Sequence, residues 1–260
     1  MPRFFVALAH TDCISYTSKI SGLREKISIL RFFPDSLRTD LLFSLSFDPS
    51  IHYNTALYDP ILFGQPTALG DAPVRDLFAD CGAFQYRDMQ IPAFADGIEV
   101  DAHSAWARYQ NLHLKKKSDN WEDILLCSPD HIVLPSHDEE EAGKRIIFTL
   151  EQAVDFLELT RGVSKVTAVG VIHGKTIDQR KQMLENYITM GYEYVALGGM
   201  VPLSNKPAEV LDIIAGIEDK GTPEIAPDSI ISRCRKAGLK LHILGLNSPD
   251  WWRWWIRLGI

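Results

Sequence analysis

Short apolar runs alternate with helical patterns along most of the chain, and this alternation constrains the fold more than any other feature. The runs that fit β-strands are Phe4–Ala9, Leu41–Phe47, Leu77–Asp80, His131–Pro135, Val166–Ile172, Tyr194–Leu197 and Leu239–Leu244. The patterns that fit helices are Asp101–Leu112, Leu150–Thr160, Ile177–Met190, Lys206–Ile217 and Asp228–Ala237. Strands that alternate with helices form βαβ units, so the sequence predicts an α/β protein with a parallel sheet.

The length of the chain narrows this prediction to a barrel. A (β/α)₈ barrel of the TIM type takes about 250 residues, which 260 residues with 46% hydrophobic content can supply as one domain over 1–260. Residues 1–75 are less regular than residues 76–260. The runs reach seven strands, and Ser248-Pro249 begins a further helix. We therefore expect a barrel that is truncated after its seventh strand and the helix that follows it. Thr149, with Gln152 three residues later, is predicted to cap the helix over 150–160.

Composition excludes several classes of protein. A net charge of −7 argues against a surface coated with basic residues for indiscriminate nucleic-acid binding. The four cysteines are widely separated and form no Cys-x-x-Cys pair, so they predict neither a disulfide framework nor a zinc site. No apolar run approaches the roughly 18 residues of a membrane span, and the first residues are apolar too briefly for a signal peptide. We expect a cytoplasmic protein without a membrane partner.

Polar residues and glycines follow the predicted strands. Asp80 ends one run, Asp138 follows another, His173 ends a third, and Gly198-Gly199 ends a fourth. Side chains at the carboxyl ends of barrel strands converge on one mouth, so these residues are predicted to share a pocket.

Each of these residues also has a purely structural explanation. Asp80 would accept hydrogen bonds from the amides of the turn that follows it, and Asp138 would lie in a solvated acidic loop. His173 would close a strand through a hydrogen bond, and the two glycines would make a sharp turn.

Taken in order, segments from about residue 75 onward resemble the tRNA-guanine transglycosylase family, which includes the queuine and archaeosine tRNA-ribosyltransferases. Asp80-Cys81-Gly82-Ala83-Phe84-Gln85 is similar to the family's Asp-Ser-Gly-Gly-Phe-Gln, and Gly170-Val171-Ile172-His173-Gly174 to its Gly-Ile-x-Gln-Gly. Ala196-Leu197-Gly198-Gly199-Met200 resembles the Gly-Gly-Leu turn, and Leu241-His242-Ile243-Leu244-Gly245 the His-x-x-Gly segment. Cys81, Ala83 and Val201-Pro202-Leu203 look closer to relatives that act on deazapurines in DNA.

The resemblance implies roles for the matched residues. Asp80 is implied to be the general acid/base, and Asp138, with one extra residue before it, to recognise the edge of guanine. His173 stands where the family has a base-recognising glutamine, which leaves the base or its pose open. Gly198, Gly199, Met200 and Phe84 lie within the matched segments and are candidates for contact with the base.

The same resemblance implies a (β/α)₈ enzyme that exchanges guanine in tRNA or DNA for a 7-deazaguanine base, through a covalent glycosyl intermediate. The chemistry suits carboxylates, because one must attack the sugar while another moves a proton on the purine. The family's nucleophilic aspartate and its zinc motif are expected beyond Ile260, so no nucleophile, metal ligand or cofactor is assigned within these residues.

Two other functions stay open at this point. The first is a noncatalytic barrel subunit that binds nucleic acid or depends on a partner, either a second copy or another chain. The second is a barrel lyase or aldolase, since Lys175 follows a strand end and Gly198-Gly199 would suit a phosphate. The sequence does not distinguish tRNA from DNA or identify the incoming base.

Overall fold

A curled, wholly parallel sheet organises the protein. The computed structural model describes residues 5–7, 13–17, 22, 24–28, 39–45, 74–111, 123–217, 224–246 and 249–258. The sheet has seven strands in the order β1-β4-β5-β6-β7-β8-β9, and every neighbouring pair is parallel. Its strands are β1 (Phe5–Ala7), β4 (Thr39–Ser44), β5 (Val74–Asp80), β6 (Ile124–Cys127), β7 (Val166–Ile172), β8 (Tyr194–Leu197) and β9 (Lys240–Ile243).

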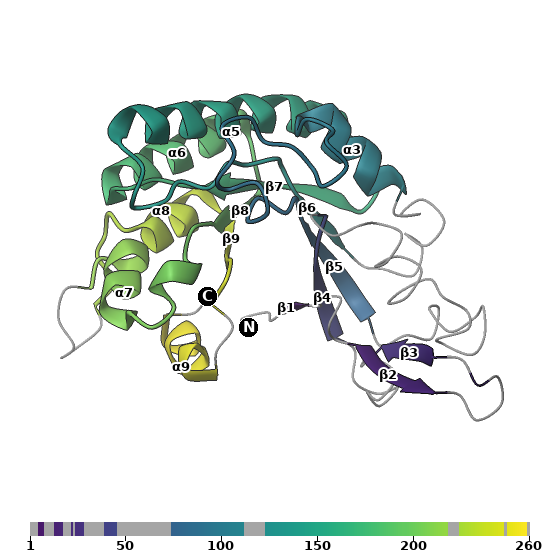
Figure 1. Cartoon of the computed structure of the whole chain (residues 1–260). Helices are drawn as coiled ribbons and strands as arrows, with labels where there is room; N and C mark the ends of the chain where they lie inside the picture. The colour runs from purple at the N-terminus through teal and green to yellow at the C-terminus, as the bar shows by residue number, and fades with distance from the viewer. Residues whose placement is uncertain are drawn as a thin grey trace.

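Helices cover the convex side of this sheet (Figure 1). They are α3 (Ala102–Asn111), α5 (Glu139–Thr160), α6 (Ile177–Met190), α7 (Pro207–Ala215), α8 (Ile230–Ala237) and α9 (Pro249–Leu258), with a 3₁₀ turn η4 (Val201–Leu203). Consecutive strands lie side by side, as the alternation of strands and helices predicted. The fold is thus α/β and consistent with a partial (β/α) barrel.

The strands bury both of their faces, with a period of two residues. In β6, Ile124 and Leu126 pack in the core that also contains helical side chains such as Phe156 of α5. Leu125 and Cys127 belong to the separate cluster formed with Phe5 and Val169. Successive side chains of a strand point to opposite faces, so β6 contributes to the helix-covered core and to a second core on the other face.

Two predictions about elements are wrong. The strand expected over His131–Pro135 is instead β6, Ile124–Cys127, and residues 131–135 belong to the connection that leads to α5. That helix begins at Glu139 with Asp138 as its N-cap, not at Leu150 with Thr149 as its cap. Thr149 is buried within α5, where its hydroxyl donates to the carbonyl of Arg145 at 2.8 Å and accepts from the amide of His131 at 3.0 Å.

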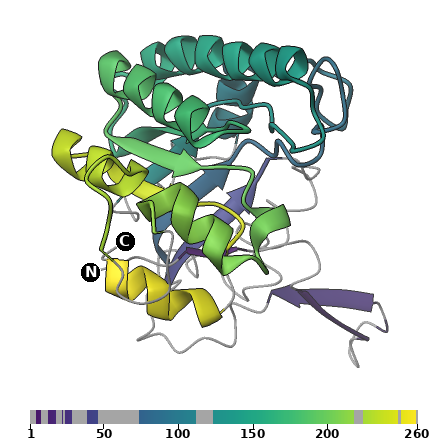
Figure 2. The same cartoon turned by 90° about the vertical axis from the view of Figure 1, so that its left-hand side faces the viewer.

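The less regular N-terminal part contains a hairpin that the sequence patterns did not reveal. β2 (Cys13–Thr17) and β3 (Arg24–Ser28) pair antiparallel as a separate sheet. Figure 2 shows this hairpin projecting from the main sheet, while α9 lies on the opposite side of the molecule from α5.

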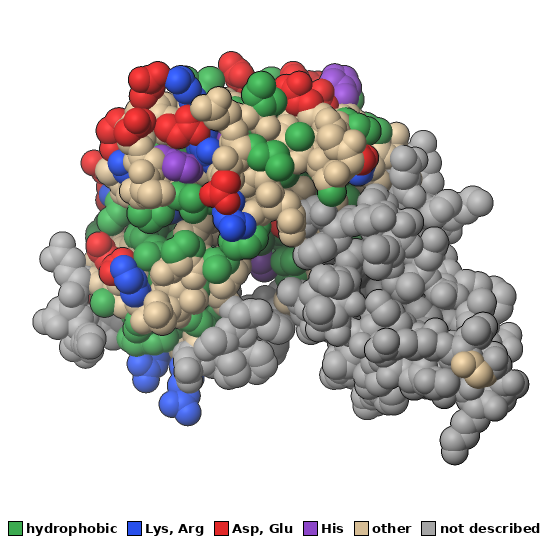
Figure 3. Space-filling model, viewed as in Figure 1, with side chains coloured by type: hydrophobic (Ala, Val, Ile, Leu, Met, Phe, Trp, Pro, Cys, Tyr) green, Lys and Arg blue, Asp and Glu red, His purple; other side chains and the backbone are tan. Residues whose placement is uncertain are grey.

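The described surface carries mixed charge. In the face drawn in Figure 3, acidic and basic side chains are interspersed over the helices, without a broad basic patch among the described residues. Among those residues, no helix has both the length and the apolar character needed to cross a membrane.

Candidate functional site

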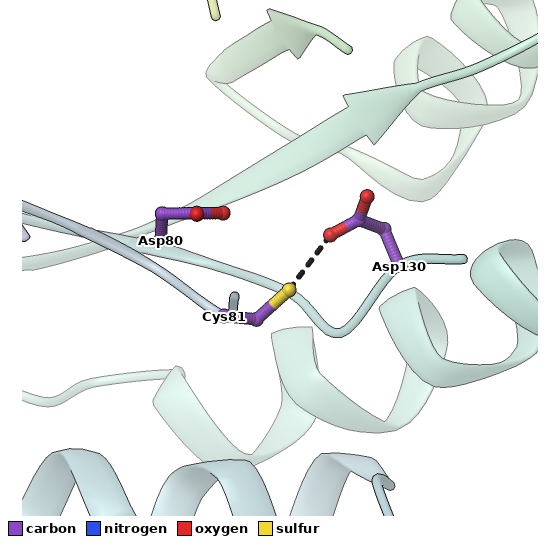
Figure 4. A group of neighbouring side chains, drawn as sticks. All are labelled: Asp80, Cys81 and Asp130. Atoms are coloured by element: carbon purple, nitrogen blue, oxygen red, sulfur yellow. Dashed lines mark hydrogen bonds between the residues drawn. The ribbon is translucent and has the colours of Figure 1, made fainter. Parts of the chain in front are cut away.

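The carboxyl ends of three neighbouring strands bring four polar side chains together. Asp80 is the last residue of β5 and Cys81 follows it, Asp130 lies just beyond β6, and His173 comes directly after β7. An oxygen of Asp80, the Sγ of Cys81 and an oxygen of Asp130 all lie within 4.8 Å of one another (Figure 4). Because β5, β6 and β7 are adjacent and parallel, their ends meet at one edge of the sheet.

Asp130 is the centre of this group. Its carboxylate is buried, and both of its oxygens have partners. The thiol of Cys81 donates to Oδ1 at 2.7 Å, and Nε2 of His173 lies 2.5 Å from Oδ2. Tyr86 extends the network, since its hydroxyl lies 3.2 Å from Cys81 Sγ. These contacts fix the direction in which the Asp130 carboxylate faces.

Asp80 has the protonation behaviour of a general acid or base. Desolvation by the surrounding protein, and then the nearby charge of Asp130, raise the pKa of Asp80 from 3.8 to about 7. Hydrogen bonds from the backbone of Gly82, the side chain of Ser44 and the backbone of Cys81 oppose this rise. A carboxyl group with a pKa near 7 can both give and take a proton near neutral pH.

Cys81 is a hydrogen-bond donor in this group. Burial, followed by the charges of Asp130 and Asp80, raises the pKa of the Cys81 thiol well above its ordinary value. The thiol therefore keeps its proton at neutral pH and donates it to Asp130. Asp80, Cys81 and Asp130 are the set of metal-ligand types that the described residues bring together. Coordination by Cys81 would require the thiolate, which this environment disfavours.

His173 has one ring nitrogen engaged and one free. Nε2 faces Asp130, whereas Nδ1 is buried without a hydrogen-bond partner among the described residues. A side chain on Gly199 would place its Cβ 3.6 Å from Nδ1 and 3.6 Å from the carbonyl oxygen of Val133. A buried imidazole nitrogen left without a partner is costly, and it marks a place where a ligand atom would complete the hydrogen bonding.

The loop after Asp80 is fastened to α5 by one side chain. The guanidinium of Arg145, which is buried, donates to the carbonyls of Arg87 at 2.6 Å, Met89 at 3.2 Å and Ile132 at 2.9 Å. It also pairs with Glu141 at 2.5 Å. Arg145 thereby joins the loops that follow β5 and β6, which hold Cys81 and Asp130.

The other predicted site residues are placed differently. Asp138 is exposed, and its carboxylate accepts the amide of Glu141 at 2.8 Å as the N-cap of α5. The structure therefore does not bring Asp138 into the group around Asp80. Phe84 is exposed, with the guanidinium of Arg87 4.0 Å from the centre of its ring, and Met200 is fully buried.

Asp130 is the residue that the sequence patterns did not single out. Its sequence signal is close to that of Asp80: the apolar run Ile124–Cys127 is followed by Ser128 and Pro129, which are turn residues, and then by an aspartate. The run over 131–135 fits a strand by its composition as well, and the first carboxylate after that run is Asp138.

Gly198→Ala is expected to disturb the contact between His173 and Asp130, although Gly198 itself is not one of the four polar residues of the site. A Cβ there would lie 2.4 Å from Cε1 of His173, so the ring must shift, and its contact with Asp130 must change with it. We expect the free energy of unfolding to fall by roughly 1–3 kcal/mol. Urea unfolding measures this effect.

Gly143→Ala is the matched control for this substitution. Gly143 lies in α5, and nothing lies within 4 Å of a Cβ built on it. It should leave the contact between His173 and Asp130 unchanged and stabilise the helix slightly. Equal unfolding free energies for the wild-type and Gly198→Ala chains would show that the ring of His173 can shift without cost.

Comparison with known proteins gives one informative relative. No protein-family model matches the chain. A DNA-guanine transglycosylase from Salmonella montevideo is 29% identical over 188 residues, which make up 70% of this chain. The chain spans only 38% of the length of that relative. It is thus a distant relative of a DNA-guanine transglycosylase, which supports its resemblance to the tRNA-guanine transglycosylase family and, within that family, to the branch that acts on DNA.

Proposed function

We propose that this chain carries the base-binding and proton-transferring part of a transglycosylase that exchanges guanine in DNA for a 7-deazaguanine base. The observation that carries the proposal is the group formed by half-buried Asp80 with buried Cys81, Asp130 and His173 at the ends of β5, β6 and β7. The distant relationship to a DNA-guanine transglycosylase supports DNA, rather than tRNA, as the nucleic acid.

Asp130 is suited to recognise guanine. The base presents two neighbouring donors on its Watson–Crick edge, the ring N1–H and the 2-amino group, and a carboxylate accepts from both. Cys81 and His173 already orient the Asp130 carboxylate, and each of its oxygens has a further lone pair for a ligand. An unstacked base is read through this edge in a pocket of this kind.

Asp80 is suited to move the proton. A purine that leaves the sugar must gain a proton, and the incoming base must lose one. Because the pKa of Asp80 is about 7, the same carboxyl group can supply the first proton and accept the second. The family resemblance assigns attack on the sugar, and hence the covalent glycosyl intermediate, to a second aspartate, which the matched segments of this chain do not include.

The barrel lyase or aldolase finds less support. Lys175 is exposed and forms an ion pair with Glu139 at 3.2 Å, outside the group around Asp130. A lysine that forms a Schiff base is instead expected in a desolvated pocket, where its pKa is lowered.

The experiment that tests the proposal separates binding from exchange. The purified chain is titrated with guanine, 7-deazaguanine and adenine, and is then incubated with labelled 7-deazaguanine and either duplex DNA or tRNA. We expect both guanine-type bases to bind and adenine to bind at least about 10-fold more weakly, because adenine presents a single donor group, at C6, on its Watson–Crick edge. Equal or tighter binding of adenine would overturn the proposal.

The incubation with labelled 7-deazaguanine tests whether the chain alone exchanges a base. Base binding without incorporation of the label is the expected outcome, since the matched segments include no carboxylate that is assigned to attack the sugar. Label incorporated into tRNA but not into DNA would overturn the choice of DNA.

A further inference from the structure

Arg180 is a buried cation that takes no part in the proposed base recognition by Asp130 or proton transfer by Asp80. It lies in the first turn of α6, only 5% exposed, and its Nη1 donates to the carbonyl oxygen of Gly198 at 3.0 Å. Burial lowers the pKa of Arg180 to about 10, so the guanidinium remains charged at neutral pH. Within the described part of the chain, no carboxylate pairs with it.

The surrounding backbone makes room for this side chain. A Cβ on Gly174 would lie 3.0 Å from Cγ of Arg180, so a side chain at that position would press on the arginine. Nη2 of Arg180 lies 3.7 Å from the place where a Cβ of Gly199 would be. A buried charge without an opposite charge is costly, and the single carbonyl of Gly198 recovers only part of that cost. The hydrogen bond to the Gly198 carbonyl is thus the main contact of the Arg180 guanidinium among the described residues.

The hydrogen bond from Arg180 to the Gly198 carbonyl also sets the direction of the Gly199 N–H. The C=O of Gly198 and the N–H of Gly199 belong to one planar trans peptide and point in opposite directions. When Arg180 holds the carbonyl, the N–H of Gly199 is turned away from the guanidinium. That N–H has no hydrogen-bond partner among the described residues. Gly199 has a φ of 70°, and Gly198 has no side chain to restrain the peptide, so this turn depends on neighbours for its orientation.

We propose that Arg180 is a positioning residue, which fixes the Gly198–Gly199 peptide so that the Gly199 amide donates to the 6-oxygen of a guanine-type base. This inference rests on the proposed function. Asp130 would read the N1–H and the 2-amino group, and the 6-oxygen is the next group along the same edge of the base. The Gly199 amide supplies the donor that this oxygen needs, on the turn whose Gly198 packs against His173.

The test compares two bases that differ in the acceptor at position 6. Guanine has an oxygen there, whereas 6-thioguanine keeps the N1–H and the 2-amino group but has sulfur, a weak acceptor. In Arg180→Met the Gly198–Gly199 peptide loses the hydrogen bond that Arg180 donates to the Gly198 carbonyl. We expect the Kd of guanine to rise about 5- to 10-fold and that of 6-thioguanine to change less than about 2-fold, both measured by calorimetry.

Two further variants control for folding and charge. Arg180→Lys keeps the cation, and if Arg180→Met fails to fold, the same comparison is made with the lysine variant, for which we expect a smaller loss for guanine alone. Lys181→Met removes the neighbouring cation of α6, whose ion pair with Asp228 at 2.7 Å lies on the surface, and should change neither Kd.

The outcomes distinguish the role of Arg180 from the proposed function. Loss of affinity for guanine alone supports the positioning role. Equal losses for both bases, or no loss for either, would overturn the inference about Arg180 and leave the proposed function standing. If the wild-type chain binds neither base, the proposed function falls, and the inference with it.

Discussion

Asp130→Asn is expected to lower the affinity of the chain for guanine about 100-fold. The substitution keeps the shape of the side chain but replaces one acceptor oxygen with a donor NH₂ group. That group would then face a second donor, either the thiol of Cys81, the ring N–H of His173 or the edge of guanine. A site built to accept two donors rejects a ligand strongly when one acceptor is lost. Calorimetric titration with guanine measures the change.

Asp138→Asn is the matched control for Asp130→Asn. It removes a carboxylate of the same type from the residue that the sequence analysis assigned to base recognition. Asparagine caps a helix nearly as well as aspartate, so α5 should keep its stability. We expect guanine to bind this variant as it binds the wild-type chain. If Asp138→Asn lost affinity while Asp130→Asn kept it, the assignment made from the sequence would be restored.

The site was predicted in part because a carboxylate at the end of an apolar strand is a local signal. Asp80 ends its strand and His173 comes directly after its own, and the structure places both beside Asp130. Asp130 is separated from its strand by two turn residues, and its importance arises from contacts across the sheet that local sequence does not reveal. Those contacts come from Cys81, far earlier in the chain, and from His173, far later.

The α/β class and several of the elements were also predicted from local signals. Ile177–Met190 and Tyr194–Leu197 were located to the residue because Gly191 marks the end of the helix and Gly198-Gly199 follows the short apolar run. α5 was predicted too short because its first half, from Glu139 to Phe148, contains the acidic run Glu139-Glu140-Glu141. Negative charge in the first turn favours a helix, and Asp138 supplies the cap, so this run is a helix start and not a loop.

Asp80→Asn is expected to have a large effect on base exchange and a small effect on base binding. Where the chain takes part in base exchange, the rate should fall about 100-fold or more, because asparagine can neither give nor take the proton. The affinity for guanine should change far less, since Asp130 and not Asp80 is proposed to hold the base. A large loss of affinity with an unchanged exchange rate would reverse these two roles.

The same substitution should stabilise the fold at high pH. The pKa of Asp80 is about 7 in the folded chain against an ordinary value of 3.8, so between these values the folded state holds a proton that the unfolded chain has released. The stability of the wild-type chain must therefore fall as the pH rises through this window. The asparagine of Asp80→Asn cannot ionise, so the variant should match the wild type near about pH 4 and exceed it above about pH 7, on the order of 2–4 kcal/mol.

Urea unfolding across this pH range measures the difference between the two chains. Asp88→Asn is the control, because Asp88 is exposed and pairs with Arg87 at the surface, at 3.4 Å. Its unfolding free energy should stay parallel to that of the wild type. A difference between Asp80→Asn and the wild type that does not grow with pH would show that Asp80 is already ionised in the folded chain near neutral pH. Asp80 would then lack the proton that the exchange reaction requires it to donate.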